Sequence, residues 1–227
     1  WYGAERDESR RMKFHTQTAG QSLTAQQPLN NIVRVTIQAL AGVLGGTQSL
    51  HTNSFDEALA LPSEKAVRVA LRTQQIIAEE SGAADIVDPL GGSFAVEALT
   101  DEIEAEITAY IDEIAAMGDG SIRDGVFEGI EQGYFQREIH DSAYEYQERV
   151  ERDEEVVVGV NAYTVAEDPE PELLRVDESV QQRQLDRLER VKAERDDSAV
   201  ETDLDALAER IENGENVVPA IVDAVKD

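Results

Sequence analysis

Apolar residues recur with strand-like patterning in three short segments and with helical spacing in the two segments between them. Residues 11–18, 47–52 and 84–87 are predicted as short strands, since each combines apolar or β-branched residues with turn-forming neighbours. Residues 30–45 and 63–82 carry apolar side chains at helical spacing, and both segments end at a glycine. This alternation is typical of parallel βα units. Three strands cannot close a barrel, so a larger α/β domain or a small open sheet is expected.

Beyond this region the pattern becomes almost entirely helical. Helices are predicted over residues 100–117, 121–152, 180–194 and 204–211. Gly125, Gly129 and Gly133 are expected to interrupt the second of these helices. Pro169 and Pro171 indicate a linker.

The composition excludes several classes of protein. The 227 residues include 20 Lys and Arg against 48 Asp and Glu, a net charge of −28 that would repel nucleic acid and anionic membranes. Cysteine is absent, which excludes disulfides, thiolate metal sites and cysteine nucleophiles. No apolar run approaches the ~20 residues of a membrane span. No signal peptide is visible either, so we expect a cytoplasmic protein.

The distribution of charge predicts a salt-adapted, halophilic protein. Lysine occurs only at positions 13, 65, 192 and 226, and the carboxylates are spread along the chain. Molar salt shortens the screening length to roughly 3 Å and would weaken the repulsion among these carboxylates. An ordinary acidic protein is the alternative.

Two polar segments near predicted strand ends are candidates for ligand binding. His15 and His51 lie in segments rich in amide and hydroxyl groups, and parallel βα proteins bind ligands at the carboxyl ends of strands. The alternative is that these groups bond to loop backbone. Glu57 would then be a helix-end carboxylate favoured by the helix dipole. The spacing of the histidines does not support a metal site.

Several longer runs resemble the methylmalonyl-CoA mutase family in order and spacing. They are Phe14-His15-Thr16-Gln17-Thr18-Ala19-Gly20, Asn30-Asn31-Ile32-Val33-Arg34, Gly45-Gly46-Thr47-Gln48-Ser49-Leu50-His51-Thr52-Asn53, Asp56-Glu57-Ala58-Leu59 and Val158-Gly159-Val160-Asn161. The resemblance implies an α/β chain that holds the last βα units of a TIM (β/α)8 barrel, followed by a mainly helical C-terminal region. Residues 1–95 would belong to the acyl-CoA-binding barrel, and residues 96–227 would form the helical linker or interface region.

The resemblance also implies the chemistry. Such a protein is an adenosylcobalamin-dependent isomerase that interconverts methylmalonyl-CoA and succinyl-CoA by a radical rearrangement. Its partners would be the acyl-CoA substrate, the rest of the barrel, a cobalamin-binding domain or small subunit, and other copies in an oligomer. The sequence departs from common family residues at Gln21, Gln27 and Leu90. The resemblance therefore says less about which acyl-CoA is the substrate.

Individual residues are assigned by their match to the family motifs. His15, Gln48 and Ser49 correspond to residues that contact the CoA chain. Gln17, Gly20, Glu57 and Ala60 correspond to residues that line the cobalamin face.

No catalytic or metal-binding residue is assigned by the resemblance, because the family's cobalt-ligating motif is not in this sequence. The chain opens at Trp1 without a methionine, which indicates a processed chain or a fragment. The isolated chain is therefore expected to be inactive. The alternatives are a related isobutyryl-CoA-type mutase and a non-catalytic assembly segment.

Overall fold

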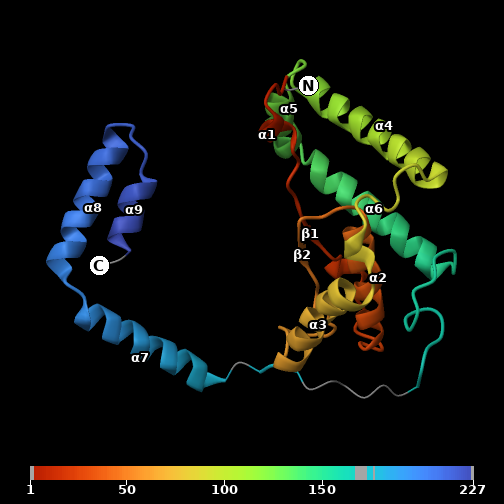
Figure 1. The fold of residues 1–227 in the computed structure, drawn as a ribbon, viewed down its shortest axis with the longest axis horizontal. Coiled ribbons are helices and arrows are strands. Elements are labelled where there is room, and N and C mark those ends of the chain that lie inside the picture. Colours follow the sequence, from red (N-terminus) through yellow and green to blue (C-terminus); the bar gives the residue numbers. More distant parts are fainter. Residues whose placement is uncertain (1–2, 167–172, 176, 226–227) are drawn as a thin grey trace. The chain divides into compact units, whose positions relative to one another are not determined.

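The chain divides into two compact units, residues 1–174 and residues 175–227. The computed structural model describes residues 3–166, 173–175 and 177–225 (Figure 1). The linker predicted at Pro169 and Pro171 lies outside the described residues. The division near residue 95 into barrel and helical regions stays a prediction.

Two short parallel strands, β1 (His15–Gln17) and β2 (Ser49–His51), confirm the first two predicted strands. They are joined by α2 (Asn30–Leu44), which buries Val35 and Ala39. At the contact between α2 and β1, a Cβ on Gly42 would lie 3.3 Å from Thr16 Cγ2. The middle residue of each strand is therefore turned toward α2, and the other strand residues are exposed on the opposite face.

The helix after β2 begins and ends as predicted. The hydroxyl of Ser63 accepts the N–H of Ala66 at the start of α3 (Glu64–Glu80), and Gly82 follows with a φ of 69°. A left-handed glycine after the last turn is a common helix end, because glycine has no Cβ to clash in that conformation.

The strand predicted at residues 84–87 is wrong. The short 3₁₀ helix η2 (Ala83–Asp85) begins there, and the side chain of Val87 is 95% exposed. A strand needs a neighbouring strand edge to take its hydrogen bonds, and no described strand offers one to this segment. The described chain is thus mainly helical, with a small parallel sheet consistent with part of an α/β domain.

Three helices follow in the same unit: α4 (Phe94–Met117), α5 (Ile122–Glu131) and α6 (Tyr134–Glu151) (Figure 1). Only Gly133, with a φ of 68°, separates two helices as predicted. Gly125 and Gly129 lie inside α5 and are buried, so the prediction that they interrupt the helix is wrong. These glycines permit close helix packing, which outweighs their low helix propensity.

Aromatic residues join α4 to α6. The rings of Tyr110 and Tyr134 lie 6.1 Å apart, and the Tyr110 hydroxyl donates to Glu138 Oε2 at 3.3 Å. The hydrogen bond with Tyr110 raises the pKa of Tyr134, and desolvation and the Glu113 carboxylate raise it further. The fold therefore favours the neutral phenol, and this contribution to stability is lost only at strongly alkaline pH.

The second unit contains α7 (Glu178–Glu194), α8 (Asp197–Glu212) and α9 (Val218–Ala224). The Asp177 carboxylate accepts the N–H of Ser179 at the start of α7. A hydrogen bond from the Ser179 side chain, and then this backbone N–H, lower the pKa of Asp177. α8 begins seven residues before the predicted start at Leu204, because Asp196 caps it, and α9 was not predicted.

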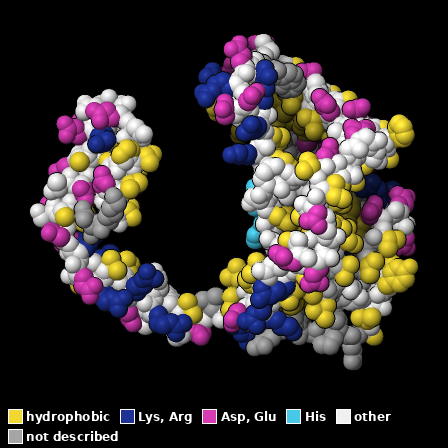
Figure 2. Space-filling view, viewed as in Figure 1, with side chains coloured by type: hydrophobic (Ala, Val, Ile, Leu, Met, Phe, Trp, Pro, Cys, Tyr) yellow, Lys and Arg dark blue, Asp and Glu magenta, His cyan; other side chains and the backbone are white. Residues whose placement is uncertain are grey.

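The surface agrees with the sequence in its charge distribution. Figure 2 shows Asp and Glu side chains dispersed over both units on the face drawn. None of the helices in the described ranges is long and apolar enough to cross a membrane. The halophilic character stays a prediction.

Candidate functional site

The exposed face of the two strands carries a row of polar side chains. His15 and Gln17 come from β1, and Ser49 and His51 lie beside them on β2. His15 Nδ1 lies 2.8 Å from Ser49 Oγ, so these two residues form one hydrogen-bonded pair. The alternation of the strands turns all four side chains away from α2, which leaves an extended polar surface.

The placement of His15, Gln48 and Ser49 corrects one expectation. They were expected with the other ligand-binding residues at the carboxyl ends of the strands. His15 and Ser49 are instead the first residues of their strands, and Gln48 precedes β2. The strands are shorter than their sequence pattern suggested, because only three residue pairs are hydrogen-bonded in register.

The side-chain amide of Gln48 bonds to backbone groups. Its Oε1 accepts the N–H of Phe14 at 2.8 Å, and its Nε2 donates to the carbonyl of Gly46 at 2.6 Å. Gln48 therefore links the start of β1 to the turn before β2, which is the internal role named as the alternative to ligand binding. One amide N–H remains for a ligand.

At the carboxyl ends of the strands a second polar group is closely packed. Asn53 is 2% exposed; its Oδ1 accepts from the Thr18 hydroxyl at 2.6 Å, and its Nδ2 donates to Glu57 Oε1 at 2.7 Å. The Glu57 side chain is exposed, with one carboxylate oxygen held by Asn53. The second oxygen can accept a hydrogen bond from a ligand donor.

Gly20 makes this arrangement possible. A Cβ at Gly20 would lie 2.9 Å from Glu57 Oε1, closer than real Cβ atoms approach, and 3.1 Å from Asn53 Nδ2, which is a tight contact. Gly20 opens the short 3₁₀ helix η1 (Gly20–Ser22). The side chain of Gln38 holds this turn, since its Oε1 accepts the Ala19 N–H at 2.7 Å and its Nε2 donates to Ser22 Oγ at 2.7 Å.

The loop that carries Glu57 and Ala60 is organised by Asp56. The Asp56 side chain is fully buried and its Oδ2 accepts the N–H of Ser63 at 2.9 Å. Its carbonyl accepts the N–H groups of Leu59 and Ala60. Asp56 Oδ1 is buried without a hydrogen-bond partner. Asp56 thus fixes the loop between β2 and α3 in two places, at Leu59 and Ala60 through its carbonyl and at Ser63 through its carboxylate.

The structure brings some of the assigned residues together and not others. Gly20 and Glu57 are in contact, and Ala60 lies on the same loop as Glu57. Gln17 lies on the strand face beside His51. Sequence reasoning missed Asn53 and Thr18, although Asn53 precedes Glu57 by four residues and lies two residues after the end of β2.

The described residues include no group of three or more His, Asp or Glu side chains placed to hold a metal ion. They do suit a polar organic ligand. The carboxylate of Glu57 is exposed, and the side chains at both ends of β1 and β2 are exposed as well, so both offer hydrogen-bonding groups to such a ligand.

We expect Gln48→Ala to weaken both the fold of the turn and ligand binding at the amino ends of the strands. The substitution removes two hydrogen bonds to backbone, worth roughly 0.5–1.5 kcal/mol each. In the complete protein we expect CoA-ester affinity to fall about 2–10-fold, with a lower melting temperature. Isothermal titration with a CoA ester and thermal unfolding measure the two effects.

Gln74→Ala is the matched control, because Gln74 donates to Thr52 on the side of α3 and lies away from the exposed strand face. Unchanged CoA-ester affinity in a folded Gln48→Ala protein would leave Gln48 with its structural role alone.

The whole chain, residues 1–227, matches the family model described as methylmalonyl-CoA mutase. It is 47% identical over 227 residues to the 2-hydroxyisobutanoyl-CoA mutase large subunit of Aquincola tertiaricarbonis, which covers 99% of the chain and 39% of that protein. It is 42% identical over 226 residues to the methylmalonyl-CoA mutase of Escherichia coli, covering 99% of the chain and 31% of that protein. The human mitochondrial methylmalonyl-CoA mutase is 43% identical over 215 residues, which cover 94% of the chain and 28% of that protein. The chain thus spans less than half the length of each of these relatives.

Proposed function

Because the chain belongs to the methylmalonyl-CoA mutase family, we propose that it forms part of an adenosylcobalamin-dependent acyl-CoA mutase. The supporting observation is the hydrogen-bonded group Thr18–Asn53–Glu57 against Gly20 at the carboxyl ends of two parallel strands. A buried amide that fixes an exposed carboxylate is a preorganised binding group, since little freedom remains to be lost when a ligand binds.

In this proposal the two ends of the strand pair serve different ligands. His15, Gln48 and Ser49 at the amino ends bind the amide-rich CoA chain, and Gln17 continues the polar face along β1. Gly20, Glu57 and Ala60 at the carboxyl ends face adenosylcobalamin. When bound, adenosylcobalamin supplies the radical chemistry of the isomerisation. The residues of this chain orient the two ligands and exclude water between them.

The rest of the protein would supply what this segment lacks. We propose that β1, α2, β2 and α3 are the last βα units of a TIM (β/α)8 barrel, and that the cobalt ligand comes from a cobalamin-binding domain or small subunit. Methylmalonyl-CoA and succinyl-CoA are the proposed substrate pair. The names of the relatives include a mutase of 2-hydroxyisobutanoyl-CoA, so that ester belongs in the same assay.

The proposal is tested with Glu57→Ala in the complete protein. Removal of the exposed carboxylate is expected to weaken adenosylcobalamin binding about tenfold, the loss of one hydrogen bond to a charged group. CoA-ester affinity should stay within twofold, because Glu57 lies at the other end of the strands from His15 and Ser49. Absorbance titration with adenosylcobalamin and calorimetry with the CoA ester measure both.

Glu79→Ala is the control, since Glu79 is an exposed carboxylate on α3 outside the polar group. Equal adenosylcobalamin affinity in the wild type, Glu57→Ala and Glu79→Ala would contradict the placement of the cofactor. Failure of the wild-type protein to isomerise either ester in the presence of adenosylcobalamin would contradict the proposed activity.

A further inference from the structure

The loop after α6, residues 155–163, is organised by one side chain. Asn161 Oδ1 accepts the N–H of Val157 at 2.8 Å, and its Nδ2 donates to the carbonyls of Val150 and Glu155 at 2.9 and 2.8 Å. Gly159, with a φ of 86°, makes the turn at its tip. The 155–163 loop is therefore a preformed unit whose shape depends on Asn161.

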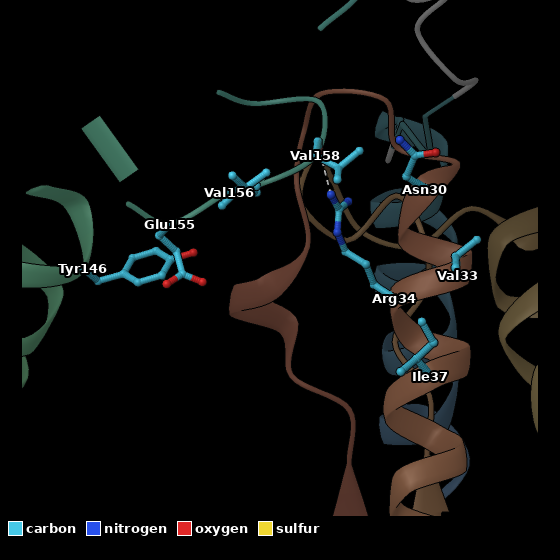
Figure 3. A pocket seen from close by; sticks show the side chains of 9 residues that line it. Asn30, Val33, Arg34, Ile37, Tyr146, Glu155, Val156 and Val158 are labelled. Atoms are coloured by element: carbon cyan, nitrogen blue, oxygen red, sulfur yellow. Dashed lines mark hydrogen bonds between the residues drawn. The ribbon is translucent and has the colours of Figure 1, made fainter. Parts of the chain in front are cut away.

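Two polar side chains bind this loop to the βα region. Arg34 on α2 donates from Nη2 to the Val158 carbonyl at 2.7 Å (Figure 3). Gln27 donates from Nε2 to the Tyr163 carbonyl at 2.9 Å. Between the loop and α2 lies a cavity of about 370 Å³, lined by Val33 and Ile37 on one side and Tyr146 and Val156 on the other. Arg34 and Gln27 thus link the loop to the βα region by hydrogen bonds, while a cavity remains between the apolar side chains on the two sides.

The same arginine reaches into the buried centre of the βα region. Its Nη1 donates to Asn31 Oδ1 at 2.7 Å and to the Thr24 hydroxyl at 3.0 Å. No carboxylate pairs with Arg34 among the residues that the structure describes. Its charge is instead compensated by neutral acceptors on two separate segments, which only a planar fork of donors can serve together.

Asn31 links Arg34 to the loop that carries Glu57 by hydrogen bonds. The Asn31 side chain is fully buried, and its Nδ2 donates to the carbonyls of Phe55 and Thr24, both at 2.9 Å. Its Oδ1 accepts both the Thr24 N–H and the Arg34 guanidinium. All of its hydrogen-bonding capacity is used, so a shift of Arg34 must either break a buried bond or move the carbonyl of Phe55.

We propose that Arg34 is a positioning residue that couples the 155–163 loop to the loop of residues 53–60, through Val158, Asn31 and Phe55. A displacement of the helical region at Val158 is transmitted to the segment that holds Asn53 and Glu57. The significance for the cofactor rests on the proposed function, but the coupling itself does not.

The test is hydrogen–deuterium exchange of the complete protein without cofactor. The reporting amides are those of Glu57, Leu59 and Ala60, which bond to Ser54 and Asp56, and those of the 155–163 loop. Arg34→Lys keeps the charge but replaces the fork with one ammonium group. We expect exchange of both groups of amides to become about tenfold faster, as for the loss of one charge-assisted hydrogen bond. Arg68→Lys is the control, because Arg68 is an exposed residue of α3 that pairs with Glu64 on the same helix.

Asn161→Ala provides a second route that leaves Arg34 in place. It loosens the 155–163 loop directly, and coupling through Arg34 predicts faster exchange at residues 53–60 as well. In the Arg34→Lys background the same substitution should add nothing at residues 53–60. If Arg34→Lys does not fold, Asn161→Ala alone decides. Faster exchange confined to the 155–163 loop in either variant, or additive effects at residues 53–60, would overturn the proposal.

Adenosylcobalamin titration of the same variants separates this proposal from the proposed function. A fall in affinity for Arg34→Lys that accompanies faster exchange at residues 53–60 supports both. If the protein shows the coupled exchange but binds no adenosylcobalamin, the coupling is supported and the proposed function is contradicted. Weaker cofactor binding with unchanged exchange at residues 53–60 overturns the coupling.

Discussion

Gly125→Ala is expected to separate α4 from α5 and to destabilise the first unit by about 3 kcal/mol or more. A Cβ at Gly125 would lie 1.9 Å from the carbonyl oxygen of Ile114 and 2.8 Å from its carbonyl carbon. Both are backbone atoms of α4, so no side-chain rotation relieves the clash. Urea unfolding followed by circular dichroism at constant salt measures the loss.

Gly120→Ala, in the turn between α4 and α5, is the matched control for this prediction. Gly120 has a φ of 93° and no atom within 4 Å of its ideal Cβ, so alanine there meets backbone strain without a clash. We expect a cost of about 1 kcal/mol. Similar losses for the two variants would show that α4 and α5 are not packed as closely as the structure describes.

Gly20→Val is expected to abolish tight adenosylcobalamin binding in the complete protein. The valine Cβ would lie 2.9 Å from the Glu57 carboxylate, and its methyl branches would press against the buried Asn53 amide. The Asn53 side chain cannot move without breaking its hydrogen bond to the Thr18 hydroxyl. Because two binding groups are displaced together, we expect the affinity to fall about 100-fold, roughly 2.7 kcal/mol. Absorbance titration measures the affinity, and CoA-ester affinity with thermal unfolding controls for a general defect.

The smaller Gly20→Ala substitution tests the cause of that loss. In the Glu57→Ala background the nearest obstacle to the new Cβ is removed, so Gly20→Ala should cost much less than in the wild type. Equal costs in the two backgrounds would show that Gly20 acts through another contact, and the close approach to Glu57 would then carry no function.

Local patterns predicted the elements whose signals are local. The spacing of apolar residues predicted α2 and α3, and Ser63 and Gly82 marked the ends of α3 correctly, since a cap depends only on the adjacent turn. The motif around His15 and the motif from Gln48 to Glu57 indicated the family, which the match of the whole chain confirms. The charge argues against nucleic acid as a partner without any knowledge of the fold, and this stays a prediction.

Only the tertiary structure decided features that depend on a partner distant in the sequence. Residues 84–87 have a strand-like composition but no strand beside them, and Gly125 resembles a helix breaker until the backbone of α4 lies against it. Gln48 was assigned to a ligand by its motif, and only the structure shows that its side-chain amide also bonds to the backbone of Phe14, 34 residues away. Arg34 carries no local sign of its role, and the position of Asn53 near Glu57 does not show that Asn53 bonds to Thr18, 35 residues away. Hydrogen bonds and steric contacts are made between atoms that the fold brings together, and the sequence pattern of one segment contains no information about which distant atoms those are.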